Sequence, residues 1–94
     1  MMSKVVMYGA SWCAPCRATK PEFEKVSTGY LSDMGVEFEY KDVDELEPDV
    51  LEALRISSVP TIILHQVNPV RIASRTHLRM EQEIEQALIS DSDG

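Results

Sequence analysis

The sequence predicts a single α/β domain in which helices flank a central four-stranded mixed sheet, with the element order βαβαββα. Three patterns lead to this prediction. A continuous apolar run precedes a helical segment, a stretch of alternating apolar and acidic residues follows, and two short strands separated by a turn precede a last helix. Strands joined through a helix are expected to be parallel, and strands joined by a short turn are expected to be antiparallel.

The first half of the chain supplies a strand, a helix and a second strand. Val5–Tyr8 is a continuous apolar run that ends at a glycine, which is typical of a strand buried on both faces. The helix is expected to reach about Thr28, with Pro15 suited to its first turn and Pro21 bending it from inside. Val36–Tyr40 alternates apolar and acidic residues and therefore predicts a strand with one face in water.

The middle of the chain predicts a short second helix. Asp44 or Glu45 could cap its N-terminus, Pro48 lies inside it, and it is expected to end near Leu54. Apolar side chains recur at helical spacing, which predicts that one face of this helix is buried: Val50, Leu51 and Leu54.

The last third predicts two strands and a helix. Thr61–Leu64 and Val70–Ser74 are expected to form an antiparallel pair, because the sequence Asn68-Pro69 favours a turn between them. Thr76 could cap the final helix. Three residues spaced four apart are expected to face the core from this helix: Met80, Ile84 and Leu88.

The size and charge of the chain limit what the protein can be. A chain of 94 residues supports one domain, expected over residues 1–89, followed by an acidic flexible tail at residues 90–94. A net charge of −7 argues against a nucleic-acid partner. No apolar run approaches the roughly 20 residues of a membrane-spanning helix. The N-terminal residues show no signal-peptide pattern, so the cytoplasm is the expected compartment. The protein is expected to be a monomer.

A pair of cysteines separated by Ala14 and Pro15 carries the chemistry. Cys13 and Cys16 lie where a strand meets a helix, and unpaired backbone N–H groups and the helix dipole stabilise an anion at such a place. The pKa of Cys13 is therefore expected below the free-thiol value of about 8.5. The spacing predicts that Cys13 attacks a substrate disulfide and that Cys16 then resolves the mixed disulfide.

The two cysteines have two alternative uses. A structural disulfide across two residues closes too small a loop to stabilise the fold much, and it is unexpected in a reducing compartment. A zinc site would need two further ligands, for which the chain offers only His65 and His77. Their spacing fits no compact zinc-finger pattern, so no metal is expected.

Three separated stretches resemble the thioredoxin family in both residues and spacing. They are Trp12-Cys13-Ala14-Pro15-Cys16, then Pro21, then Ser58-Val59-Pro60-Thr61. The acidic run that starts at Asp42 also resembles the end of that family's strand at this position. The resemblance covers Val5 to about Leu88 and implies a thioredoxin-like fold. Because only twelve residues precede Cys13, it implies a minimal, glutaredoxin-sized form.

The resemblance also implies a docking surface and partners. Pro60 is expected to follow a cis peptide bond, the backbone of Val59 to pair with an extended substrate segment, and Trp12 to line the groove beside Cys13. Three further residues are expected to belong to this surface: Ala14, Pro15 and Thr61. The implied partners are proteins with disulfides and a thioredoxin-reductase-like electron donor, and no bound cofactor is expected.

Three positions depart from the family pattern. Ala14 stands where typical thioredoxins have a glycine, a small change that should keep the fold. Met7 stands six residues before the first cysteine, where thioredoxins keep a buried acid, so another base or water must accept the proton of Cys16. Lys41 could lie near the site. Thr76 takes the place of a glycine that lines the groove, and it should narrow that groove.

Two rival functions follow from the same fold. A glutaredoxin-like, glutathione-linked oxidoreductase usually carries a pair of glycines after the proline hairpin, but residues 74–77 contain none. A thioredoxin-like binding or scaffold module needs neither thiol, so the intact cysteine pair argues against it. Reduction of protein disulfides is the favoured function.

A stretch without acidic residues surrounds the expected groove. Residues 53–80 contain four arginines and no aspartate or glutamate. Arg75 and Arg79 flank Thr76, which favours a local positive field at the groove rim. The alternative is that these arginines pair with the acids of Glu37–Glu52.

Overall fold

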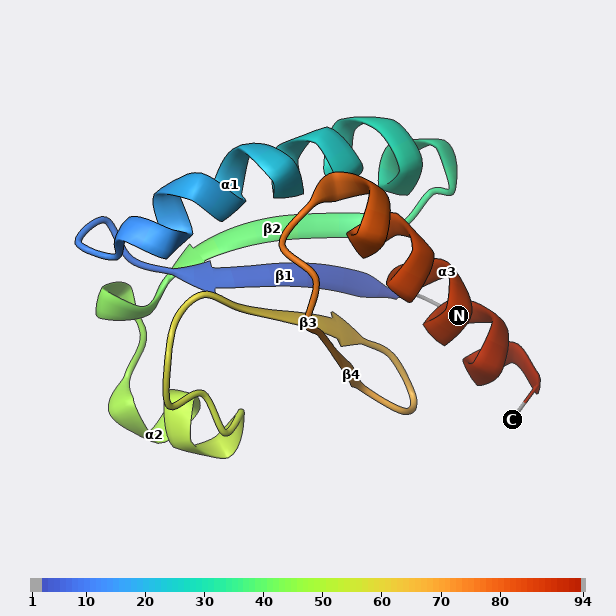
Figure 1. Ribbon diagram of the computed structural model, residues 1–94. Coiled ribbons are helices and arrows are strands. Elements are labelled where there is room, and N and C mark those ends of the chain that lie inside the picture. The colour runs from blue at the N-terminus through green and yellow to red at the C-terminus, as the bar shows by residue number, and fades with distance from the viewer. Residues whose placement is uncertain (1–2, 94) are drawn as a thin grey trace.

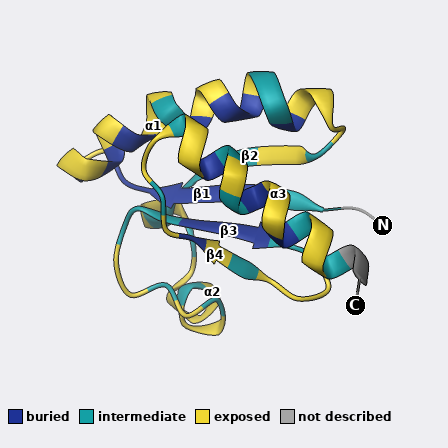
Figure 2. Ribbon diagram, turned by 45° about the vertical axis from the view of Figure 1, so that its right-hand side comes forward, coloured by how far each residue is buried: buried dark blue, intermediate teal, exposed yellow. Residues whose placement is uncertain are grey.

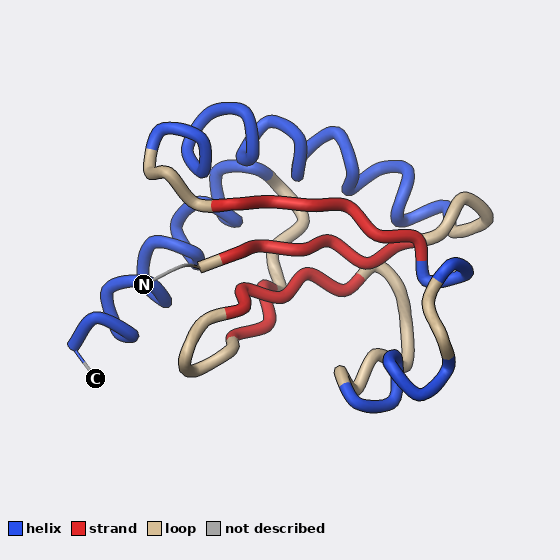
Figure 3. The backbone as a smooth tube through the Cα atoms, turned by 180° about the vertical axis from the view of Figure 1, so that it is seen from behind, coloured by secondary structure: helices blue, strands red, loops and turns tan. Residues whose placement is uncertain are grey.

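The computed structural model describes the backbone of residues 3–93 and the side chains of residues 3–91. Four strands form one mixed sheet in the order β2-β1-β3-β4 (Figure 3). Central strand β1 is parallel to β2 and antiparallel to β3, and β4 is antiparallel to β3. The strand bounds are β1 Lys4–Gly9, β2 Glu37–Asp42, β3 Thr61–His65 and β4 Val70–Ile72. The predicted strand directions are confirmed.

Helices cover both faces of the sheet. Helices α1 and α3 lie side by side on one face, and the short α2 lies on the other (Figure 1). The bounds are α1 Ala14–Val26, α2 Pro48–Ala53 and α3 His77–Asp93. A π-helical turn, Ser27–Leu31, extends α1, and a 3-10 turn, Val43–Glu45, follows β2. The predicted α/β class and element order are therefore confirmed.

Strand β1 is buried on both faces, as its apolar sequence predicted (Figure 2). Alternate residues enter different cores: Val5 and Met7 pack in the larger cluster under α1 and α3, and Val6 and Tyr8 pack in a smaller cluster. Leu54 is one of the residues that cover the smaller cluster. The strand is thus held between two hydrophobic clusters. Its C-terminal end is fixed in place, and this fixes the start of the segment that follows it.

The second helix starts later than the sequence predicted. Asp44 and Glu45 belong to the 3-10 turn, in which the carboxylate of Asp42 accepts a hydrogen bond from the backbone N–H of Asp44 at 2.9 Å. Helix α2 therefore begins at Pro48, and neither expected residue caps it. Val50 is 39% exposed, so the expectation that it faces the core is wrong.

The start of α3 is capped from another helix. The expected cap, Thr76, makes no side-chain hydrogen bond there; Glu22 of α1 accepts hydrogen bonds from the backbone N–H and the ring Nδ1 of His77, both at 2.9 Å. Residues 90–93, expected in an acidic tail, continue α3, and Asp91 accepts a hydrogen bond from the backbone of Asn68. Gly94 lies outside the described residues.

Glu22 should make the stability of the fold depend on pH. Its hydrogen bonds with His77, and a further one from Lys25, hold its pKa at about 2, below the usual 4.5. A carboxyl whose pKa is lowered by folding stabilises the folded state above its unfolded pKa, and this contribution is lost as the pH falls toward about 2. Glu22→Gln should therefore lower the free energy of unfolding at neutral pH, with a difference from the native chain that shrinks below pH 4.5.

Urea unfolding across this pH range measures the effect. Glu24→Gln is the matched control, because Glu24 lies on the same helix and its side chain makes no hydrogen bond or ion pair in the described structure. A Glu22→Gln deficit that does not change between neutral and acidic pH would show that the carboxylate charge has no part in it.

Candidate active site

The cysteine pair lies at the end of the sheet where several elements meet. Strand β1 ends there, α1 begins there, and the chain that follows β2 and the start of β3 lie at the same end (left in Figure 1). All the residues that the sequence singled out as catalytic or substrate-binding are in these segments, from Trp12 to Cys16 and from Val59 to Thr61. The fold brings the two segments together, although they are far apart in the chain.

Cys13 occupies the N-cap position of α1 and is joined to Cys16 by a disulfide, with 5.2 Å between the two Cα atoms. The backbone N–H of Cys16 donates to the Cys13 Sγ at 3.2 Å. No acidic residue lies in the first turn of the helix. A thiolate at Cys13 would therefore meet a backbone donor and the positive end of the helix dipole without a local negative charge. Both cysteines are buried, and Cys13, at 5% exposed, is slightly more exposed than Cys16, at 1%.

The loop before β3 faces the cysteines. The Val59–Pro60 peptide bond is cis, as the resemblance implied, and the carbonyl oxygen of Val59 lies 3.6 Å from the Cys13 Sγ. The hydroxyl of Thr61 donates to the carbonyl oxygen of Ser58 at 2.7 Å, which closes the loop on itself. The backbone of Val59 is thus held directly beside the first cysteine.

Trp12 lies on the surface next to Cys13. Its side chain is 65% exposed, and its indole N–H donates to the carboxylate of Asp44 at 2.9 Å. The indole is therefore fixed in position while its faces stay available for contact. Asp44 was missed as a site residue, because the acidic run gave no sign of which acid reaches the tryptophan.

The lysine near Cys16 is not the one that the sequence suggested. Met7 is fully buried in the same cluster as both cysteines. Lys41 pairs in register with Tyr8, on the sheet face away from that cluster, so the idea that Lys41 neighbours the site is wrong. Lys20, one helical turn after Cys16, takes this place instead.

Cys16 borders an open hollow of about 310 Å³ that is also lined by polar side chains. Cys16 lines it together with Lys20, Tyr40 and Asp42. The Lys20 Nζ lies 4.2 Å from the centre of the Tyr40 ring. The pKa of Tyr40 is raised by burial and by the negative charge of Asp42. A proton of Cys16 can thus leave toward polar groups and water in this hollow, even though Met7 offers no acceptor.

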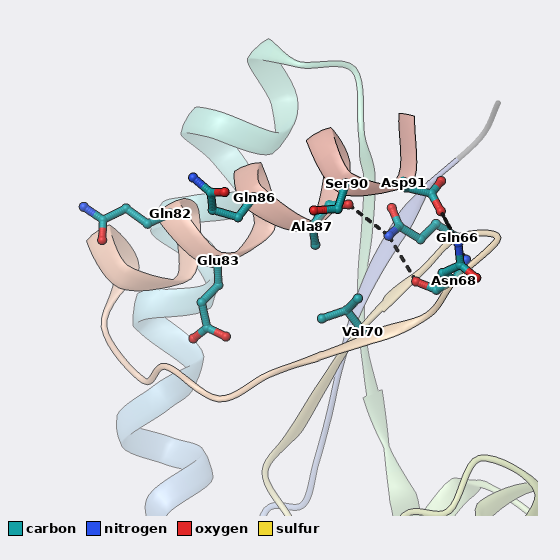
Figure 4. A pocket seen from close by; sticks show the side chains of 9 residues that line it. All are labelled: Gln66, Asn68, Val70, Gln82, Glu83, Gln86, Ala87, Ser90 and Asp91. Carbon is teal, nitrogen blue, oxygen red and sulfur yellow. Dashed lines mark hydrogen bonds between the residues drawn. The ribbon is translucent and has the colours of Figure 1, made fainter. Parts of the chain in front are cut away.

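A second hollow is remote from the cysteines. It measures about 520 Å³ and lies between the β3–β4 region and α3 (Figure 4). Gln66, on its wall, donates to the backbone carbonyls of Asn68 and Ala87, and its own carbonyl oxygen is buried without a partner. None of the predicted site residues lines this hollow.

The histidines take structural positions. The ring Nε2 of His65 lies 3.0 Å from the hydroxyl of Tyr8, and burial, helped by the charges of nearby lysines, lowers the pKa of His65. His77 contacts Glu22. Within the described part of the chain, no group of three or more metal-binding side chains could hold an ion. The described helices also include none with the length and apolar character needed to cross a membrane.

A cysteine pair at a helix start, opposite a cis-proline loop on a four-stranded mixed sheet, defines the class of thioredoxin-like domains. The chain belongs to the thioredoxin family, since the Thioredoxin family model matches residues 2–90.

Relatives and solved structures agree with this assignment. The chain is 37% identical over 62 residues to a thioredoxin of Mycoplasma pneumoniae, a match covering 66% of this chain and 57% of that protein. It is 40% identical over 60 residues to Thioredoxin-1 of Saccharomyces cerevisiae, covering 64% and 54%. These matches span little more than half the length of each relative.

Similarity to solved structures covers nearly the whole chain. The Trx4 domain of ERdj5 superposes with a TM-score of 0.81 at 24% identity, covering 93% of this chain and 80% of that one. Chloroplastic thioredoxin z superposes with a TM-score of 0.72 at 27% identity, covering 90% and 77%. The first similarity, at its low identity, shows the fold alone.

Proposed function

We propose that the protein is a dithiol–disulfide oxidoreductase that reduces disulfides of other proteins. The observation that carries the proposal is the Cys13–Cys16 disulfide at the start of α1, with the carbonyl oxygen of Val59 only 3.6 Å from the Cys13 Sγ. Membership of the thioredoxin family supports it. The reaction needs no bound cofactor, because the two thiols carry both electrons.

The reaction follows from the positions of the two sulfurs. In the reduced protein, the Cys13 thiolate attacks one sulfur of the substrate disulfide, and the other substrate sulfur leaves as a thiolate that takes up a proton. Cys16 loses its proton to water or to the Asp42 carboxylate in the hollow that it lines, and the resulting thiolate attacks the Cys13 Sγ. The second substrate thiol is then released. The substrate has gained two electrons, and the protein is left with the disulfide seen in this structure.

The docking surface in this proposal surrounds the first cysteine. The backbone of Val59 pairs with an extended substrate segment, as an added strand pairs with a sheet edge. Pro60 keeps that backbone beside the sulfur, and Trp12 contacts the segment from the other side. Three exposed or half-buried residues complete the surface: Ala14, Pro15 and Thr61.

A thioredoxin-reductase-like donor would return the two electrons to the disulfide. This cycle requires a reducing compartment such as the cytoplasm, and each step needs only one copy of the chain. Glutathione is the competing donor, and residues 74–77 lack the glycine pair that glutaredoxins usually carry.

Insulin reduction tests the proposal. With dithiothreitol as the electron source, catalytic amounts of the protein should accelerate precipitation of the insulin B chain. The double variant Cys13→Ser with Cys16→Ser serves as the control and should leave only the background rate. A native chain that gives no more than this background would favour a binding or scaffold role for the domain.

A further inference from the structure

A small hollow beside the cis-proline loop is bordered by two arginines. It measures about 250 Å³ and lies where the start of β3 faces the end of β4. Pro60 and Thr61 form one side, and Arg71 and Arg75 belong to its wall. None of the residues that line it is acidic. A positively charged recess therefore adjoins the loop that lies against Cys13.

The two arginines keep their charge free of carboxylates. Arg71 donates through Nη2 to the carbonyl oxygens of Leu54 at 2.8 Å and Arg55 at 2.7 Å, which fixes its guanidinium against the end of α2. Arg75 is exposed and makes neither a hydrogen bond nor an ion pair among residues 3–91. No arginine in that range pairs with an acid, so the alternative that they neutralise Glu37–Glu52 is wrong.

The segment that carries Arg75 is held in place by an acid that is already occupied. Glu83 of α3 accepts hydrogen bonds from the backbone N–H groups of Ala73 at 3.2 Å and Ser74 at 2.7 Å, and from the Ser74 hydroxyl. Burial would raise the pKa of Glu83, but these hydrogen bonds outweigh it and lower the pKa. The Glu83 carboxylate thus anchors the segment, and both of its oxygens already accept hydrogen bonds from Ala73 and Ser74.

Charges of opposite sign therefore lie on the two sides of Cys13. On one side Trp12 holds the carboxylate of Asp44, and on the other the recess presents Arg71 and Arg75. A protein segment lying along the Val59 backbone would meet a negative group at one side and the two arginines at the other. Guanidinium groups bind carboxylates through charge-assisted hydrogen bonds with defined geometry.

We propose that this recess, the Arg71–Arg75 recess, binds an acidic side chain next to the disulfide of the partner protein. The proposal rests on the proposed function, because it names the substrate class of the same site. An acidic residue there would speed encounter through attraction and fix the register of the docked segment. The effect should weaken as salt screens the exposed charges.

Matched disulfide peptides test the proposal. Two peptides differ only in a glutamate or a lysine immediately before the cysteine, and a second pair carries the same residues immediately after it. At low salt the native protein should reduce the glutamate peptide of one pair about two- to fivefold faster, the size of an exposed ion pair. The ratio should approach one in high salt.

Variants locate the preference. Arg75→Gln should remove the preference for glutamate, and Arg75→Glu should reverse it. Arg79→Glu changes the net charge equally but lies outside the recess, and it should keep the native ratio. Equal rates for both peptides with the native protein, or the same loss in Arg79→Glu as in Arg75→Glu, would overturn the recess as a binding site.

A neutral substrate separates this inference from the function on which it rests. The native protein is assayed on bis(2-hydroxyethyl) disulfide, which carries no charge. If the protein reduces this compound but reduces both peptides of each pair at equal rates, only the binding role of the recess is overturned. If it reduces neither this compound nor any peptide, the proposed function and the binding role of the recess are both overturned.

Discussion

Replacing Cys16 with serine is expected to turn the protein into a trap for its substrates. Cys13 can still attack a substrate disulfide, but no second thiol is present to resolve the mixed disulfide. Turnover of insulin should fall to the background rate, because the first attack occurs but the mixed disulfide is not resolved. Covalent adducts should accumulate and should be visible on non-reducing gels and by mass spectrometry.

Cys13→Ser is the matched comparison. It removes the sulfur that lies against Val59 and leaves the nearly inaccessible Cys16, so it should lose turnover without accumulating adducts. Adducts in Cys13→Ser and none in Cys16→Ser would reverse the roles of the two cysteines. Each variant removes the disulfide, so differences between them do not reflect its loss.

Replacing Met7 with aspartate is expected to have the second-largest effect. Met7 is fully buried, and a carboxylate there would be an uncompensated buried charge that lowers the free energy of unfolding by roughly 3–5 kcal/mol. The same charge lies in the cluster that contains both cysteines, so it should disfavour a thiolate at Cys13. The pH midpoint of the thiolate absorbance should rise by roughly one unit.

Met7→Asn separates charge from shape. Asparagine has nearly the same size as aspartate and also leaves a buried polar group, but it carries no charge. Ultraviolet titration of the reduced proteins should place the midpoint of Met7→Asp above those of Met7→Asn and the native chain. A midpoint in Met7→Asp equal to or below that of Met7→Asn would mean that the residue at this position does not act electrostatically on Cys13.

The features that the sequence predicted correctly depend on local patterns. The apolar run of β1, the cysteine spacing at the start of α1 and the proline before β3 each combine a backbone preference with a short stretch of residues. The resemblance to thioredoxins added the relation between the cysteines and Pro60, which no local pattern provides. These features place the main residues of the candidate site.

The features that the sequence did not predict depend on contacts between distant segments. Glu22 caps α3 across 55 residues, and a local pattern suggested Thr76. The register between β1 and β2 turns Lys41 away from the cysteines, and a shift of one residue would have placed it on the other face. Arg71 borders the recess because its strand, β4, pairs with β3. The sequence showed only that Arg71 is one of several arginines in a stretch without acids, so it did not predict this position.

A single turnover tests the central claim most directly. Fully reduced protein is mixed with an equal amount of insulin without any other reductant, and both products are followed by mass spectrometry. The account predicts that one Cys13–Cys16 disulfide forms for each insulin disulfide that is reduced, because each event transfers two electrons. Insulin that stays intact while the protein keeps both thiols reduced would contradict it.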